Sequence, residues 1–315
     1  MSTPDAPQTS DPITATTASL PRLLCLHGGG VTAEIFHLQL RSLRAQLAPH
    51  FRCVAADGPF FCAPGPGMLP VYGGMGPYRR WLRWLEDEHA AVGDEEAVEE
   101  VEFAVREAMG EDEARGGRGE WVGLVGFSQG AKVAGSVLYE SQLRLEEVRG
   151  RRLEVREGKP QEDGMYGGFS AEDGSNEGEE KPPLDLRDMP PGLGGGHWKF
   201  AILLNGRAPL VKLSALSAGS KTMVGAGAVS EGGFEFDVSE NTDRLVLPHV
   251  HVHGLQDPGL HLHRRLRDYY TAGDAVETVE WDGGHRVPLK KEDIRRVAEA
   301  TLRAARRAGV VVAAE

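Results

Sequence analysis

Short apolar runs alternate with longer amphipathic segments along most of this chain of 315 residues. The apolar runs predict buried β-strands at residues 22–27, 51–56, 121–127, 199–205, 246–253 and 275–281. The amphipathic segments predict helices at about 33–47, 77–91, 94–109, 129–144, 258–271 and 291–308. Strands and helices that alternate in this way are typical of an α/β protein with a doubly wound, mostly parallel sheet of about six strands flanked by helices.

The third apolar run leads directly into a serine between two glycines. Residues 121–130 read WVGLVGFSQG, and a helix of small residues follows. A serine hydroxyl becomes an effective nucleophile when a sharp strand-to-helix turn lifts its Oγ clear of the backbone. Gly126 and Gly130 allow such a turn to close without side-chain collisions. The segment therefore predicts Ser128 as a catalytic nucleophile.

An acid and a base follow at the ends of later strands. Asp257 comes after the run 246–253 and a short turn, and His285 comes after the run 275–281. The carboxyl ends of parallel strands form the edge at which such sheets bind ligands. The order serine, acid, histidine is that of an α/β-hydrolase. Asp282 is closer to His285 along the chain, but we expect its side chain to point elsewhere because two glycines separate the two residues.

The glycine-rich turn after the first strand supplies a further part of the site. The apolar run 23–26 is followed by His27 and then by three glycines. Such a turn can aim a backbone N–H group at the oxyanion that forms on attack, together with the N–H group of Gln129. The donor from the turn is Gly29 or Gly30, and the sequence leaves both open.

A loop after the second strand carries apolar side chains to the same edge of the sheet. Prolines and glycines punctuate residues 57–72, and exposed apolar side chains on a stiff loop suit a hydrophobic acyl pocket. The alternative is that these aromatic residues simply cover the sheet edge. Trp81, from the helix expected at 77–91, is expected in the core. The expected pocket residues are Phe60, Phe61, Met68, Tyr72 and Tyr78.

These segments together resemble the fungal "family of serine hydrolases". The resemblance covers roughly residues 22–305 apart from two insertions. Within the family it is most similar to the stand-alone thioesterases and ester hydrolases of polyketide biosynthetic clusters, of the lovastatin-chain-releasing type. The resemblance implies the same three catalytic residues. Acyl transfer to water by such a triad implies no cofactor. The motifs that carry it include Leu26-His27-Gly28, Asp57-Gly58-Pro59-Phe60, Pro77-Tyr78-Arg79-Arg80-Trp81, Gly126-Phe127-Ser128-Gln129-Gly130 and Gly284-His285.

Three segments lack the alternating pattern. Residues 1–20 are rich in serine, threonine and proline and are expected to form a disordered tail without a secretory signal. Residues 150–196 become acidic and glycine-rich with few apolar side chains, which predicts a mostly disordered insertion rather than a folded lid. Residues 217–236 are a second glycine-rich excursion. The remainder of 21–310 is expected to form a single catalytic domain.

Composition narrows the partners and the compartment. A net charge of -12 and a pI near 5.5 argue against a nucleic-acid surface, which needs a basic stripe. No apolar run approaches membrane-spanning length, so no membrane partner is expected. Three cysteines, Cys25, Cys53 and Cys62, form neither a disulfide framework nor a metal-binding spacing. This cysteine usage indicates a reducing compartment, and we expect a cytoplasmic protein.

Closely spaced histidines raise the question of a metal. His249, His251 and His253 alternate along a predicted strand and therefore project to one face, and His261 and His263 follow soon after. A zinc site needs three or four convergent ligands. The position of His253, just before the turn that carries the acid, explains that residue without a metal, and the shared face can pack beneath a loop. We expect no metal.

The sequence thus supports a hypothesis about the reaction. The chain is expected to be a serine hydrolase that cleaves an acyl thioester or ester and releases a polyketide chain from the acyl carrier domain of a synthase. One alternative is a carboxylesterase that acts on small soluble esters. A second is a non-catalytic α/β-hydrolase scaffold that binds a ligand. Such scaffolds usually lose one member of the triad, whereas this chain has all three.

Overall fold

Six parallel strands form the central sheet of the computed structural model, which describes residues 8–85, 93–156, 186–229, 243–273 and 276–312. The strand order is β2-β1-β5-β6-β7-β8, and every neighbouring pair is parallel. The predicted strands are confirmed to within a few residues. Their bounds are β1 Arg22–Leu26, β2 Arg52–Ala56, β5 Trp121–Phe127, β6 Phe200–Leu204, β7 His249–Gly254 and β8 Val276–Trp281.

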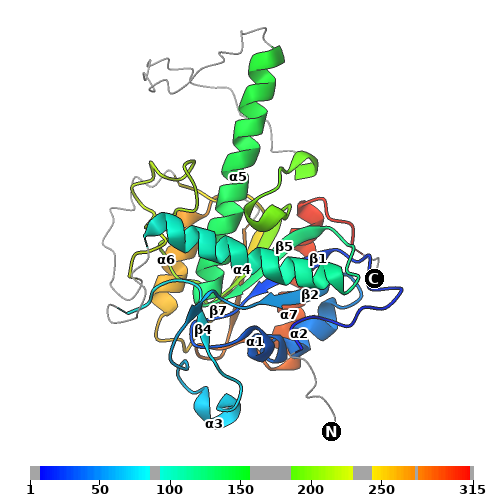
Figure 1. Ribbon diagram of the computed structural model, residues 1–315, viewed down its shortest axis with the longest axis vertical. Coiled ribbons are helices and arrows are strands. Elements are labelled where there is room, and N and C mark those ends of the chain that lie inside the picture. Colours follow the sequence, from blue (N-terminus) through cyan, green and yellow to red (C-terminus); the bar gives the residue numbers. More distant parts are fainter. Residues whose placement is uncertain (1–7, 86–92, 157–185, 230–242, 274–275, 313–315) are drawn as a thin grey trace.

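Helices cover both faces of the sheet (Figure 1). The helices α1 Ala33–Gln39, α2 Arg41–Leu47 and α7 Lys291–Arg307 pack on one face, and α4 Asp94–Ala114, α5 Gln129–Arg156 and α6 Leu260–Tyr270 pack on the other. Alternation along each strand supplies both cores. In β1, Leu24 and Leu26 face α4 and α5, whereas Leu23 and Cys25 face the opposite helices. No helix in the described residues is long and apolar enough to cross a membrane.

The helix predicted at 77–91 is wrong over the described residues up to Leu85. Instead, β4 (Arg79–Arg80) pairs antiparallel with β3 (Phe60–Phe61) in a small separate sheet. The side-chain oxygen Oε1 of Gln129 accepts hydrogen bonds from the backbone N–H groups of Trp81, at 2.7 Å, and Leu82, at 3.2 Å. These two N–H groups therefore do not donate to the backbone carbonyls of a helix. Trp81 is fully buried, so its expected place in the core is confirmed.

The predicted disordered tail is wrong for residues 8–20, which lie in part against the sheet. Thr9 accepts a backbone hydrogen bond from Ala55 at 2.7 Å, and Ser10 forms an antiparallel bridge with Val54. The carboxylate of Asp11 accepts from the backbone N–H of Cys53 at 2.8 Å. This segment covers β2, which is the edge strand of the sheet and would otherwise expose unpaired backbone groups.

The insertion expected at 150–196 has ordered residues at both of its ends. Helix α5 continues to Arg156, well beyond the predicted end at 144. At the other end, Met189 and Leu193 are buried in the core beside α4 and α5, and Trp198 Nε1 donates to the carbonyl of Leu193 at 2.9 Å. The disorder expected for 157–185 concerns residues outside those described, as does the part of the second excursion from 230 onward.

Candidate active site

Ser128 occupies the turn between β5 and α5 in a strained backbone conformation. Its φ is 53°, in the left-handed region that side chains rarely adopt, and its N–H donates to the carbonyl of Leu204 at 2.8 Å. A Cβ at Gly126 would lie 2.4 Å from the carbonyl oxygen of Gly130. A Cβ at Gly130 would lie 2.1 Å from that of Leu26. Both glycines are required by close backbone packing, as the elbow geometry demands.

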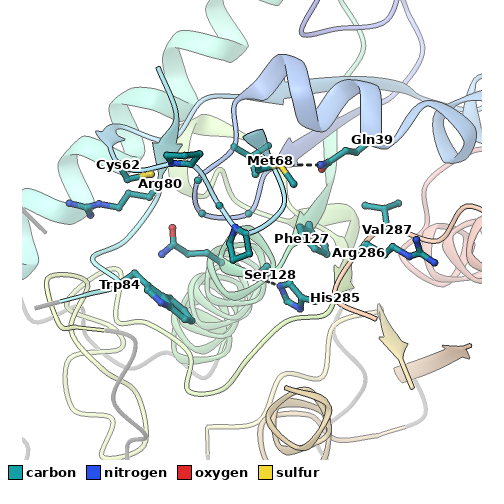
Figure 2. A pocket seen from close by; sticks show the side chains of 18 of the residues that line it. Gln39, Cys62, Met68, Arg80, Trp84, Phe127, Ser128, His285, Arg286 and Val287 are labelled. Atoms are coloured by element: carbon teal, nitrogen blue, oxygen red, sulfur yellow. Dashed lines mark hydrogen bonds between the residues drawn. The ribbon is translucent and has the colours of Figure 1, made fainter. Parts of the chain in front are cut away.

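The structure brings the predicted serine, histidine and acid together, and Figure 2 shows the contact between Ser128 and His285. Nε2 of His285 lies 2.9 Å from Oγ of Ser128, and Nδ1 of His285 lies 2.6 Å from Oδ2 of Asp257. Asp257 follows β7 and His285 follows β8, so both come from the carboxyl edge of the sheet. Asp282 is exposed and accepts a hydrogen bond from Gln256 at 2.7 Å. The geometry therefore favours Asp257 as the partner of His285.

Asp257 is held by more groups than the sequence suggested. Its Oδ1 accepts from the backbone N–H of Gly259 at 2.8 Å, and its Oδ2 also contacts Nε2 of His263 at 2.9 Å and the side-chain amide of Asn205. Burial by itself raises the pKa of Asp257, but the hydrogen bonds from Gly259, His263 and His285 outweigh it and hold the pKa below its ordinary value. A carboxylate held in this way stays ionised and keeps His285 oriented.

Sequence reasoning missed His263 and Asn205 as neighbours of the acid. Asn205 directly follows β6, and a polar residue at the carboxyl end of a predicted strand is a signal that the sequence offers. In the structure its φ is 50°. His263 lies on α6, where Nδ1 contacts the carbonyl of Gly206 at 2.9 Å and Nε2 contacts Asp257. Its role depends on how α6 packs against the sheet, which no local pattern reveals.

One of the two expected oxyanion donors is already occupied. The N–H of Gly30 donates to the carbonyl of Arg79 at 2.9 Å, so the expectation for Gly30 is wrong. The N–H groups of Gly29 and Gln129 form no hydrogen bond within the described part of the chain, and both residues line the same cavity as Ser128. These two groups remain the candidate donors to a developing oxyanion.

A cavity of about 800 Å³ opens over Ser128. Figure 2 shows Ser128 and His285 between Trp84 on one side and Val287 on the other. The loop predicted to form the pocket contributes through Met68 and Tyr72. Trp84, Leu85, Phe127, Val287 and Leu289 add further apolar surface that the sequence did not single out.

Phe60, Phe61 and Tyr78 do not line the cavity, so their assignment to the pocket is wrong. The β3–β4 pairing places Phe61 under the guanidinium of Arg79, 3.9 Å from the ring centre, and leaves the phenyl 62% exposed. Phe60 lies in the same way under Arg80. Tyr78 is buried in a small cluster with Val31 and Ile35, although its hydroxyl donates to the carbonyl of Tyr72 at 2.7 Å.

The histidines of β7 are buried side by side. The ring centres of His249 and His251 are 5.0 Å apart and those of His251 and His253 are 5.6 Å apart, and all three side chains are fully buried. Burial lowers the pKa of His249 and of His253 to about 4, and burial followed by the two neighbouring imidazoles lowers the pKa of His251 well below its ordinary value. These rings therefore stay neutral near pH 7.

The side chains in the described residues that are grouped closely enough to hold a metal ion are not the histidines of β7. Ligand atoms of Asp257, His263 and His285 lie within 4.8 Å of one another. They contact each other at 2.6 and 2.9 Å, as hydrogen-bonded groups do. Two ligands about 2.0–2.2 Å from a shared tetrahedral ion lie more than about 3 Å apart, so the arrangement fits proton sharing rather than metal coordination.

We expect stability to fall as the pH drops from about 6.5 to about 4, because the unfolded chain binds protons that the buried imidazoles of β7 do not. His251, whose two ring nitrogens have no hydrogen-bond partner in the described structure, should contribute most. His251→Leu should raise the free energy of unfolding at pH 5 by about 1–3 kcal/mol, and by less at pH 7.5.

Urea denaturation at both pH values measures this difference. His261→Leu, which removes an exposed imidazole, is the matched control and should keep the wild-type difference between the two pH values. An unchanged pH dependence in His251→Leu would show that the buried histidines do not govern acid stability.

The doubly wound sheet, the serine elbow and the Ser128–His285–Asp257 contacts define an α/β-hydrolase. The chain belongs to the serine hydrolase family FSH1, whose family model matches residues 16–297. It is 37% identical over 298 residues to esterase pigG of Monascus ruber, with 94% of this chain and 95% of the relative covered. It is also 37% identical over 299 residues to the probable esterase tazC of Aspergillus terreus, with 94% and 97% covered.

Solved structures resemble the chain more distantly. Acyl-protein thioesterase 2 of Zea mays has 16% identity and a TM-score of 0.46, covering 94% of this chain and 98% of that one. A Bacillus cereus carboxylesterase has 16% identity and a TM-score of 0.44, covering 92% and 91%.

Proposed function

We propose that this serine hydrolase cleaves an acyl thioester or ester through an acyl-enzyme intermediate on Ser128. The observation that carries the proposal is the unbroken contact series from Oγ of Ser128 through the His285 ring to the Asp257 carboxylate, at the floor of a largely apolar cavity. The esterase names of its relatives in Monascus and Aspergillus support the same class of reaction.

The two ring nitrogens of His285 have different tasks in this mechanism. Nδ1–H donates to Asp257, which leaves Nε2 as the acceptor that faces the Ser128 hydroxyl. As Oγ attacks the carbonyl carbon, Nε2 takes the hydroxyl proton and Asp257 stabilises the imidazolium that results. The N–H groups of Gly29 and Gln129 hold the oxyanion of the tetrahedral intermediate.

The imidazolium then returns its proton in each half of the reaction. Collapse of the first tetrahedral intermediate expels the thiol or alcohol, which takes the proton from Nε2. Water enters, Nε2 accepts one of its protons, and the hydroxide formed attacks the acyl carbonyl. The second collapse releases a carboxylic acid and restores the Ser128 hydroxyl.

The lining of the cavity favours long acyl chains. Apolar side chains from several separate segments, among them Met68, Tyr72, Trp84 and Val287, surround the space above Ser128. Each buried methylene contributes about 0.8 kcal/mol. We infer that the physiological substrate is a polyketide-like acyl thioester carried by an acyl carrier domain in the cytoplasm. This finer assignment follows the resemblance to polyketide-releasing hydrolases.

Activity on N-acetylcysteamine thioesters should rise with acyl length. Because 0.8 kcal/mol corresponds to about fourfold in binding, kcat/KM should increase about fourfold per added methylene from acetyl until the cavity is full. Steady-state kinetics on a series from acetyl to dodecanoyl measures this, with matched ethyl esters as the control for the leaving group. A flat profile or a preference for acetyl esters would instead support a carboxylesterase for small soluble substrates.

A further inference from the structure

Arg207 lies in the active-site cavity with unused hydrogen-bond donors. It follows β6 by three residues and lines the same cavity as Ser128. Its guanidinium carbon lies 5.4 Å from the centre of the Trp84 ring, which gives the guanidinium a flat support. Its Nε is buried without a hydrogen-bond partner, and the side chain forms no ion pair within the described part of the chain. A guanidinium normally satisfies its five donors, so this cavity lacks an acceptor.

A second buried cation lies close to Arg207. Lys132 is one helical turn beyond Ser128 on α5 and is 4% exposed. Within the described residues its ammonium has no hydrogen bond and no ion pair. Burial, and then the charge of Arg207, lower the pKa of Lys132 to about 8. The two cations are near enough to repel each other, and neither is neutralised by a described carboxylate.

The other charges around the cavity do not compensate. Arg41, Arg80 and Arg286 also line it, whereas the single carboxylate among its lining residues is that of Asp257. Asp257 is already engaged by His263 and His285. The whole chain carries a net charge of -12, so the excess of cations among the charged residues of this cavity runs against the overall composition. Unpaired buried cations are costly unless an anion joins them.

We propose that Arg207, with the positive charge of Lys132 nearby, forms an anion subsite in the cavity, which binds an anionic oxygen group of the substrate while Ser128 attacks the acyl carbonyl. Such a group is either a carboxylate on the acyl chain or the phosphate of a phosphopantetheine arm. The subsite rests on the proposed function of this cavity and adds charge recognition to it. Trp84 supports the guanidinium, whose fork can meet two oxygens, and Lys132 adds a second positive charge to this part of the protein.

Two matched substrate pairs test the subsite and separate the two sources. The first pair is the N-acetylcysteamine thioester of hexanoate and the mono-thioester of adipate, which differ by a carboxylate. The second is hexanoyl pantetheine and hexanoyl 4′-phosphopantetheine, which differ by a phosphate. The readout is the ratio of kcat/KM for the anionic member to kcat/KM for the neutral member, so a general loss of activity cancels.

In at least one pair this ratio should fall tenfold or more in Arg207→Gln and in Lys132→Met. The pair that responds identifies the group that the subsite binds. Arg106→Gln is the control, because it removes one positive charge from a 65% exposed side chain on α4 and should leave both ratios unchanged. A smaller fall in both pairs for both variants overturns the subsite.

The failure of this proposal differs from the failure of the proposed function. If wild-type protein cleaves the neutral hexanoyl thioester, but both kcat/KM ratios are unchanged in the Arg207 and Lys132 variants, the hydrolase assignment stands and the subsite is overturned. If wild type cleaves no member of either pair, the proposed function itself fails. Should Arg207→Gln not fold, competitive inhibition of wild type decides: 4′-phosphopantetheine or adipate must inhibit at a tenfold lower concentration than pantetheine or hexanoate, and equal inhibition overturns the subsite.

Discussion

Ser128→Ala should lower kcat by a factor on the order of 10⁴ to 10⁶ while the protein remains folded. The loss is large because the hydroxyl makes the bond to the acyl group, and no other group in the cavity replaces it. The stability change should be small, since a single hydroxyl contributes about 1 kcal/mol. Hydrolysis of a p-nitrophenyl ester, with thermal unfolding measured in parallel, checks both statements.

Ser141→Ala is the matched control for this substitution. Ser141 is also buried on α5, and its Oγ donates to the carbonyl of Val137 at 2.9 Å. It lies 13 residues beyond Ser128, which is about 20 Å along the helix. We expect wild-type kcat in Ser141→Ala, and comparable losses in both variants would mean that helix α5, rather than the Ser128 hydroxyl, is being perturbed.

The second large effect is expected at Asp257. Asp257→Asn keeps the size of the side chain, but the new amide can present N–H to Nδ1 of His285 and stabilise the wrong tautomer. Loss of the orienting carboxylate in a triad costs about 10⁴ in kcat. The lowered pKa of Asp257 shows that its surroundings favour the ionised form that this substitution removes. Steady-state kinetics should show a large fall in kcat with a small change in KM.

Asp282→Asn provides the control for sequence proximity to His285. The Asp282 side chain is exposed and bonded to Gln256 rather than to the imidazole. This variant should keep most of the wild-type kcat. If Asp282→Asn were inactive and Asp257→Asn active, the assignment of the acid would be reversed.

The triad was predictable because its parts follow from short-range signals and one rule of topology. The alternation of strands and helices fixed which strand ends share an edge of the sheet, and Ser128, Asp257 and His285 each follow a strand end. The glycines of the elbow could also be interpreted locally, since the space around Gly126 and Gly130 is filled by nearby backbone.

The errors arise where distant segments decide the outcome. Tyr78, Trp81, Leu82 and Leu85 have helical spacing, but the side chain of Gln129 binds the backbone of this segment and β4 pairs with β3. The same pairing stacks Phe61 under Arg79 and removes it from the pocket. Arg79 also accepts the N–H of Gly30. The long-range contacts of the segment around Arg79, with β3, with the turn at Gly30 and Val31 and with Gln129, thus explain the wrong helix, the wrong assignment of Phe61 and the wrong oxyanion donor.

Composition alone misjudged the edges of irregular segments. The high content of glycine and acidic residues in 150–196 predicted disorder, but Met189 and Leu193 within this segment are buried near α4 and α5. The polar tail contains Asp11, whose carboxylate binds both Arg44 and the N–H of Cys53 on the edge strand. A few well-placed contacts are enough to order a polar segment, and average composition does not detect them.

Covalent labelling tests the central claim most directly. A fluorophosphonate reacts with a serine only when a neighbouring base activates it and the phosphonyl oxygen can be stabilised. Intact mass spectrometry followed by peptide mapping should show one adduct per chain, on Ser128, in wild type and none in Ser128→Ala. An adduct at another residue, or undiminished labelling of Ser128→Ala, would contradict the assignment of Ser128 as the nucleophile.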